Sequence, residues 1–240
     1  MTYDWKAAVA FIGLLIALTF LARFLAFRIP ALERMRVLNR EADRLKLDRQ
    51  RFKEAVKRSG RVGLWTNLVF YVAVLPFCIT LDTPPLWQLP VQVVAILMLF
   101  DFFYYLTHRF LFHGKALRRV HALHHRALKP TYIDSLYVHP LETFIGLVLF
   151  LGSIPLIALA NGGPLNAPAV AIATLVFTQV NTINHTYVNL PRFPFKTLHW
   201  ATSIHAAHHV TMNRGNFATL TMVYDWLFGT LEEPVQRTSP

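Results

Sequence analysis

The chain has 240 residues, of which 54% are hydrophobic and only 15% are charged, and its formal net charge is +11. This composition excludes a disordered, collagen-like or polar nucleic-acid-binding protein, because the basic excess lies beside long apolar runs and is better explained by a membrane surface. The single cysteine, Cys78, excludes an internal disulfide, a cysteine-ligated zinc site and an iron–sulfur cluster.

Five apolar stretches are long enough to cross a bilayer, which takes about 20 helical residues. In chain order they run from Ala7 to Phe27, Gly63 to Leu81, Leu86 to Leu106, Thr143 to Ala160 and Leu165 to Asn184. The first stretch lacks the basic leader and cleavage site of a signal peptide, so we expect it to be retained as an anchor. The sequence therefore predicts an all-α integral membrane protein with about five transmembrane helices.

Basic residues indicate how these helices are oriented. They gather in segments 28–61, 109–129 and 192–237, whereas the short loops 82–85 and 161–164 have none. Because Lys and Arg beside a span resist translocation, we expect the three basic segments on the cytoplasmic side, in a bacterial inner membrane.

Segment 30–60 has apolar residues at helical spacing with dense charge between them, which indicates an amphipathic helix. We expect it to lie on the membrane surface; a dimerising coiled coil is the alternative, so the oligomeric state stays open. The sequence thus predicts residues 1–62 as an N-terminal membrane anchor and basic amphipathic helix, and residues 63–240 as a second, histidine-bearing domain.

All eleven histidines lie between His108 and His209, at the cytoplasmic ends of the predicted spans. The pattern His-x2-His-His occurs twice, and helical residues three and four apart share a face, so each copy can direct three imidazoles into one site. One metal ion rarely takes more than six ligands, so the set predicts two metal ions in a helical cap. The expected ligands are His108, His113, His121, His124, His125, His185, His205, His208 and His209, with Asn181 coordinating directly or through a water.

The ligand type narrows the choice of metal. Imidazole suits iron, copper, zinc and nickel, but structural zinc sites close at four ligands, whereas two iron ions beside acyl chains fit an oxygen-activating centre. We expect two iron ions, which zinc can replace during purification. A membrane metal transporter or metal sensor is the alternative, disfavoured because the histidines gather at one surface instead of along a path.

Other polar residues near the spans are expected to support the ligands or contact the substrate. Asp101, Tyr105 and His108 share a helix face, so Asp101 is expected either to orient a ligand imidazole or to bind a neighbouring span. Glu142 is either a helix-start acid or a partner of a ligand, and His139 and His199 complete this group. No catalytic residue is expected beyond the metal ligands.

The order of these motifs, together with Asp101 to Arg109, His139-Pro140 and Tyr224 to Thr230, resembles the fatty acid hydroxylase superfamily, the membrane di-iron group that includes sterol desaturases. The resemblance implies that residues 63–240 form a di-iron hydroxylase domain with the nine histidines as iron ligands. It implies O2 as co-substrate and hydroxylation or desaturation of an unactivated C–H bond in a lipid such as a sterol or fatty acyl chain. It also implies an external electron donor, a reductase, ferredoxin or cytochrome, while substrate and regiochemistry stay open.

Overall fold

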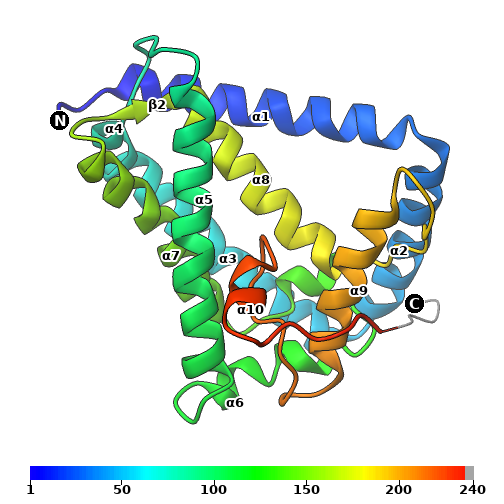
Figure 1. Ribbon diagram of the computed structural model, residues 1–240. Helices are drawn as coiled ribbons and strands as arrows, with labels where there is room; N and C mark the ends of the chain where they lie inside the picture. The colour runs from blue at the N-terminus through cyan, green and yellow to red at the C-terminus, as the bar shows by residue number, and fades with distance from the viewer. Residues whose placement is uncertain (236–240) are drawn as a thin grey trace.

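The computed structural model describes residues 1–235 and is mostly helical, which confirms the predicted fold class at that level (Figure 1). Its α-helices are α1 (Trp5–Phe27), α2 (Pro30–Leu47), α3 (Gln50–Ala73), α4 (Leu75–Cys78), α5 (Gln88–Thr107), α6 (Arg118–His121), α7 (Pro140–Ala160), α8 (Ala167–His185), α9 (Lys196–Val210) and α10 (Val223–Leu227). The shorter elements are the π-helical turn η1 (His108–Phe112), the 3-10 turns η2 (His124–Arg126) and η3 (Tyr132–Leu136), and the strands β1 (Ile79–Thr80) and β2 (Leu165–Asn166), which pair in parallel.

Three helices of the described chain are long and apolar enough to cross a membrane: α1, α5 continued through η1 to Phe112, and α7. The expected five spans are therefore not confirmed, since α3 and α8 are not among the three. α3 begins with residues 50–61, a segment rich in charged side chains, and is apolar only in its second half. The last turns of α8 carry Thr, Asn and His side chains. Both helices thus combine an apolar part with a polar part near the histidines.

The helices form a fan that opens toward the histidines. α5 packs against α7 and α8, α3 packs against α7, and α1 packs against α8. Figure 1 shows α1, α5 and α8 close together near β2 and splayed apart toward α2, α9 and α10. The core of the fan includes the stacked rings of Phe150 and Phe177, whose centroids are 4.0 Å apart, with Phe100 edge-on to both. The splayed end leaves room for a polar site between the helices.

The basic segment 30–60 differs from its prediction. It is not one helix: Arg49 is extended, so α2 ends at Leu47 and α3 begins at Gln50. The buried residues of α2 are the polar Asn39 and Asp43, whereas Leu45 is 70% exposed. Asn39 exchanges two hydrogen bonds with the backbone of Tyr187, at 2.8 and 2.9 Å. α2 is therefore held to the histidine-bearing end by polar contacts.

The predicted division of the chain between residues 62 and 63 falls inside α3, which continues through it as one helix. That division stays a prediction.

Candidate metal centre

The nine predicted histidines lie in two compact groups. The first group is His108, His113, His121, His125 and His208, and the second is His124, His185, His205 and His209. Within each group one nitrogen per ring lies within 4.8 Å of every other. Each group could hold a metal ion, and metal binding by these residues stays a prediction.

Local backbone geometry explains how η1 brings two of these rings together. His108 and His113 are five residues apart, a spacing that in an α-helix turns the second side chain away from the first. η1 instead is a π-helical turn, closed by a 2.9 Å hydrogen bond from the His113 amide to the His108 carbonyl. π-turns inside helices are frequent at functional sites, and this one places both rings in the first group.

Each His-x2-His-His motif is shared between the two groups, which differs from the expectation that each triad serves one site. On α9, His205 and His209 belong to the second group and His208 to the first. Consecutive helical residues point about 100° apart, so His208 and His209 cannot face the same centre. The first motif is divided likewise, with His124 in the second group and His121 and His125 in the first. Both motifs therefore lie between the groups and tie them together.

The distances between rings fit a shared cation. In the first group Nε2 of His121 lies 3.0 Å from the Nε2 atoms of both His108 and His125. In the second group Nε2 of His185 lies 3.1 Å from that of His124 and 3.0 Å from that of His205. Two nitrogens bound at right angles to one metal at about 2.1 Å lie about 3.0 Å apart. These separations therefore match neighbouring ligands of one ion.

Protonation gives a stricter test of this fit. The Nδ1–H of His113 donates to the Met212 carbonyl at 2.8 Å, and that of His208 donates to the Gly215 carbonyl at 2.7 Å. A carbonyl only accepts, so in the neutral rings the proton is on Nδ1 and the lone pair is on Nε2. Those two Nε2 atoms are 3.2 Å apart. Two facing lone pairs repel unless a cation lies between them, so the residues present fit a metal ion.

A proton is a poor substitute for that cation because the rings are buried. Burial lowers the pKa of His113 below its ordinary value of 6.5 and lowers that of His125 to about 3. The pKa values of His208 and His209 fall well below 6.5, first through burial and then through neighbouring histidines. The rings are therefore neutral near pH 7, which is the form that binds metals.

One loop, residues 212–217, supplies three backbone carbonyls that orient rings of the first group; we call it the carbonyl loop. Besides Met212 and Gly215, the Phe217 carbonyl accepts from the Nδ1–H of His108 at 2.7 Å. Gly215 is required there, since a Cβ on it would lie 2.1 Å from the Thr230 carbonyl oxygen. These three hydrogen bonds fix the orientation of the rings and leave each Nε2 free to bind metal.

Two predicted carboxylates contact different partners. Glu142, in the first turn of α7, accepts from Nδ1 of His121 at 2.8 Å, so it supports a ring of the first group. Asp101 contacts no imidazole. It accepts from the backbone N–H groups of Thr219, Leu220 and Thr221 at 2.9 to 3.0 Å, and from the Thr221 hydroxyl. Asp101 thus anchors residues 219–221, which belong neither to a ligand imidazole nor to a neighbouring span.

The remaining predicted residues lie outside the two groups. Tyr105 is fully buried and accepts from Arg109 at 2.7 Å. His139 caps α7 by accepting from the Leu141 amide, and Nδ1 of His199 donates to the Val188 carbonyl. The backbone carbonyl of Asn181 accepts from Nδ1 of His185, at 2.7 Å. Water-mediated coordination by the Asn181 side chain stays a prediction.

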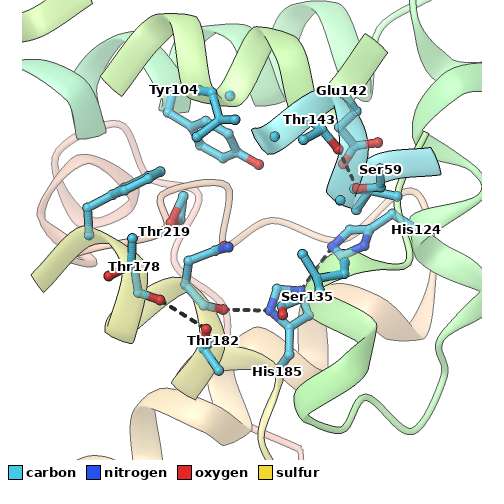
Figure 2. Close-up of a pocket in the computed structure, with 18 of the residues that line it drawn as sticks. Ser59, Tyr104, His124, Ser135, Glu142, Thr143, Thr178, Thr182, His185 and Thr219 are labelled. Carbon is cyan, nitrogen blue, oxygen red and sulfur yellow. Dashed lines mark hydrogen bonds between the residues drawn. The ribbon is translucent and has the colours of Figure 1, made fainter. Parts of the chain in front are cut away.

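A cavity of about 380 Å³ reaches the rings of both groups. It is lined by His108 of the first group and by His124, His185 and His205 of the second. Figure 2 shows Ser59 and Thr143 on one side of it and Thr178 and Thr182 on the other, with Tyr104 and His185 between them. The α3 side of this cavity could not be predicted from the sequence, because it is the packing of α3 against α7 that brings Ser59 there.

Two buried oxygens at the inner part of this cavity lack a hydrogen-bond partner within the described chain. They are Oε2 of Glu142 and Oγ1 of Thr219, and both residues are more than nine-tenths buried. Buried polar atoms normally bind a partner, so a ligand or water with a polar group is expected there. The cavity is therefore polar near the rings, and Leu64, Leu147 and Phe177 line it farther out.

The fold and these groups define a helical membrane protein with two histidine groups able to bind metal ions. Comparison with known proteins gives its family: the chain belongs to the fatty acid hydroxylase family, whose model matches residues 93–230 and so includes all nine histidines. α3, on the cavity wall, lies before the matched region. No solved structure matches the chain.

Several curated relatives are similar over part of their length. Protein CER1-like 2 of Arabidopsis thaliana is 33% identical over 162 residues, which are 63% of this chain and 26% of the relative. Very-long-chain aldehyde decarbonylase GL1-11 of Oryza sativa subsp. indica is 32% identical over 156 residues, 61% of this chain and 54% of the relative. The chain thus spans about half or less of these relatives. Both are plant proteins, which gives the expected bacterial membrane no support.

Proposed function

We propose that this protein is a membrane-bound, O2-dependent oxidoreductase that holds two iron ions in its histidine groups and oxidises a C–H bond of a lipid. One observation carries the proposal: the Nε2 atoms of nine histidines converge in two groups, and rings of both groups line one cavity. Two bound iron ions would supply the activation of O2. The histidines would hold them, and the carbonyl loop and Glu142 would orient the rings.

Iron is favoured over zinc by ligand number and by angle. The first group offers five nitrogens, whereas a zinc site of four ligands is tetrahedral. At bond lengths of about 2.1 Å, tetrahedral ligands would lie about 3.4 Å apart, and ligands at right angles about 3.0 Å apart. The first group has separations of 3.0 to 3.2 Å, which favours an ion that accepts right-angled ligands.

The cavity suggests how a lipid is held. Leu64, Leu147 and Phe177 would contact its hydrocarbon chain, and burial of the chain would exclude water from the reacting carbon. The unpartnered oxygens of Glu142 and Thr219 would bind a polar group of the substrate or a water beside it. Hydroxylation and desaturation both fit this arrangement.

A second candidate reaction is conversion of a long-chain aldehyde. It is favoured by the relatives named as very-long-chain aldehyde decarbonylases and by the polar inner part of the cavity, which fits an oxygen-bearing lipid end. The two candidates differ in where the substrate is attacked. A carbonyl end close to the histidines favours the second, and a methylene group there favours the first.

Electrons would come from an external donor, and the basic segments around the histidine groups would face the cytoplasm. The external donor is a proposal that rests on the family alone.

The test uses iron-loaded protein in lipid nanodiscs with an artificial reductant and isotopically labelled O2. Long-chain fatty acyl lipids, sterols and long-chain aldehydes are supplied in parallel, and products are identified by mass spectrometry. We expect an oxidised, desaturated or shortened lipid that forms only with O2 and reductant, and that a His208→Ala variant does not form. Equal product from that variant would overturn the proposal.

A further inference from the structure

Three sides of the cavity are closed by packed helices. α3 packs against α7, α7 against α5, and α5 against α8, while η3 contacts both α3 and α8 at one end. The fourth side lies between α3 and α8, which share no extensive contact within the described chain. Cavity-lining residues on both edges of this side are exposed: Gly60 and Leu64 of α3, and Thr178 of α8. The cavity therefore opens to the outside between these two helices.

The mouth lies where α3 changes from charged to apolar. The charged part of the helix ends at Arg61, and the exposed side chains of Leu64, Trp65, Leu68 and Val69 follow it. Basic residues suit the headgroup region and exposed apolar residues suit the acyl chains, so this part of α3 lies at the boundary between the two. An opening at that level faces the lipids directly.

Gly60 keeps this opening free. A Cβ on Gly60 would meet no atom within 4 Å, so the glycine leaves open space at the edge of the cavity. One turn later the wall is closed, since a Cβ on Gly63 would already contact Leu147 and Thr143 at 3.7 and 3.8 Å. A 2.7 Å hydrogen bond between Ser59 and Thr143 closes the same wall on the other side of Gly60.

We propose that a lipid chain passes from the bilayer into the cavity between α3 and α8, and that Gly60 determines which lipids can pass. A bulky side chain at position 60 would fill the open space beside Gly60 and block this opening. This inference rests on the proposed lipid-modifying function but places a specificity determinant on α3, outside the region that the family model matches.

The test is photolabelling in nanodiscs with a long-chain alcohol that carries a diazirine near its hydroxyl end. Peptide mass spectrometry measures labelling at Tyr104, which lines the cavity, relative to labelling at Phe20, which is 72% exposed on α1. We expect Gly60→Phe to lower this ratio by about tenfold or more. The matched control is Gly152→Phe on α7, where a Cβ also meets nothing within 4 Å but which does not line the cavity, and its ratio is expected to stay unchanged.

A second variant approaches the mouth from the opposite helix. The Thr178 hydroxyl bonds only to carbonyls of its own helix, so Thr178→Phe should block the mouth without breaking a contact between helices. A lower ratio of Tyr104 labelling to Phe20 labelling in both variants, with unchanged metal content, supports the inference. An unchanged ratio in both variants, or absence of Tyr104 labelling in the unaltered protein, overturns it. Labelling requires neither metal nor turnover, so failure of the proposed reaction would leave this result readable.

Discussion

The Nε2 atoms of His113 and His208 lie 3.2 Å apart, while Nδ1 of each ring donates to a backbone carbonyl. In neutral rings this arrangement sets two lone pairs against each other, and only a cation between them makes it favourable. His113 directly follows η1 and His208 is on α9, so the two residues are far apart in the sequence. The fold therefore brings these two rings together in a geometry that fits a cation.

Glu142→Gln should weaken metal binding without unfolding the protein. The Glu142 carboxyl group accepts from Nδ1 of His121, and an amide oxygen in its place is a weaker acceptor, which makes the imidazole a weaker ligand. We expect the affinity for Fe²⁺ or Co²⁺ to fall by about tenfold, measured by metal titration in detergent. Glu41→Gln on the exposed face of α2 is the control and should bind metal normally. Equal affinity in both variants would show that Glu142 has no role in supporting the ligand.

Asp101→Asn should destabilise the protein and loosen the carbonyl loop. The carboxylate accepts hydrogen bonds from three backbone N–H groups and one hydroxyl. The NH2 group of an asparagine would face these donors and could not accept from them. The expected loss is about 3 kcal/mol of stability, seen as a lower melting temperature in detergent. Asp48→Asn, at the exposed end of α2, should leave the melting temperature unchanged. A normal melting temperature for Asp101→Asn would contradict the anchoring role.

Gly215→Ala should disrupt the first histidine group. The added Cβ would lie 2.1 Å from the Thr230 carbonyl, so the loop must move and the Gly215 carbonyl must shift away from His208. We expect metal content to fall along with about 2 kcal/mol of stability. Gly13→Ala on α1, where the Cβ meets nothing within 4 Å, is the matched control. Full metal content in Gly215→Ala would show that this loop does not position the ring.

Metal-stripped protein should lose stability as the pH falls below about 6.5, the ordinary value for histidine. The pKa values of His113 and His125 are lowered in the folded state, so between their ordinary and folded values the unfolded chain binds protons that the folded chain does not. Stability then decreases as pH decreases, by about 1.4 kcal/mol per pH unit for each such histidine. Melting temperatures measured from about pH 8 to pH 5 test whether stability decreases as the pH falls. A melting temperature that rises toward pH 5 would contradict it.

The sequence predicted the helical fold class and the family, because apolar runs and histidine spacing are local signals. It predicted five spans, whereas three helices of the described chain are long and apolar enough; α3 is not among them, because its second half is apolar but its first half is charged. The nine histidines could be named from spacing, but their division into two groups depends on the π-turn η1 and on the different directions in which His208 and His209 point from α9. The role of Asp101 and the carbonyls of the loop could not be predicted, because both depend on contacts between α5 and the C-terminal segment.

The most direct test of the account is the metal content of protein purified from iron-replete cells, measured by elemental mass spectrometry beside a His208→Ala variant. We expect about two iron ions per chain in the unaltered protein and clearly less iron in the variant. Zinc in place of iron in the same amount would support the two metal sites but give the redox chemistry no support, because zinc can replace iron at imidazole ligands during purification. Absence of any metal in correctly folded protein would contradict the central claim that the two histidine groups are metal sites.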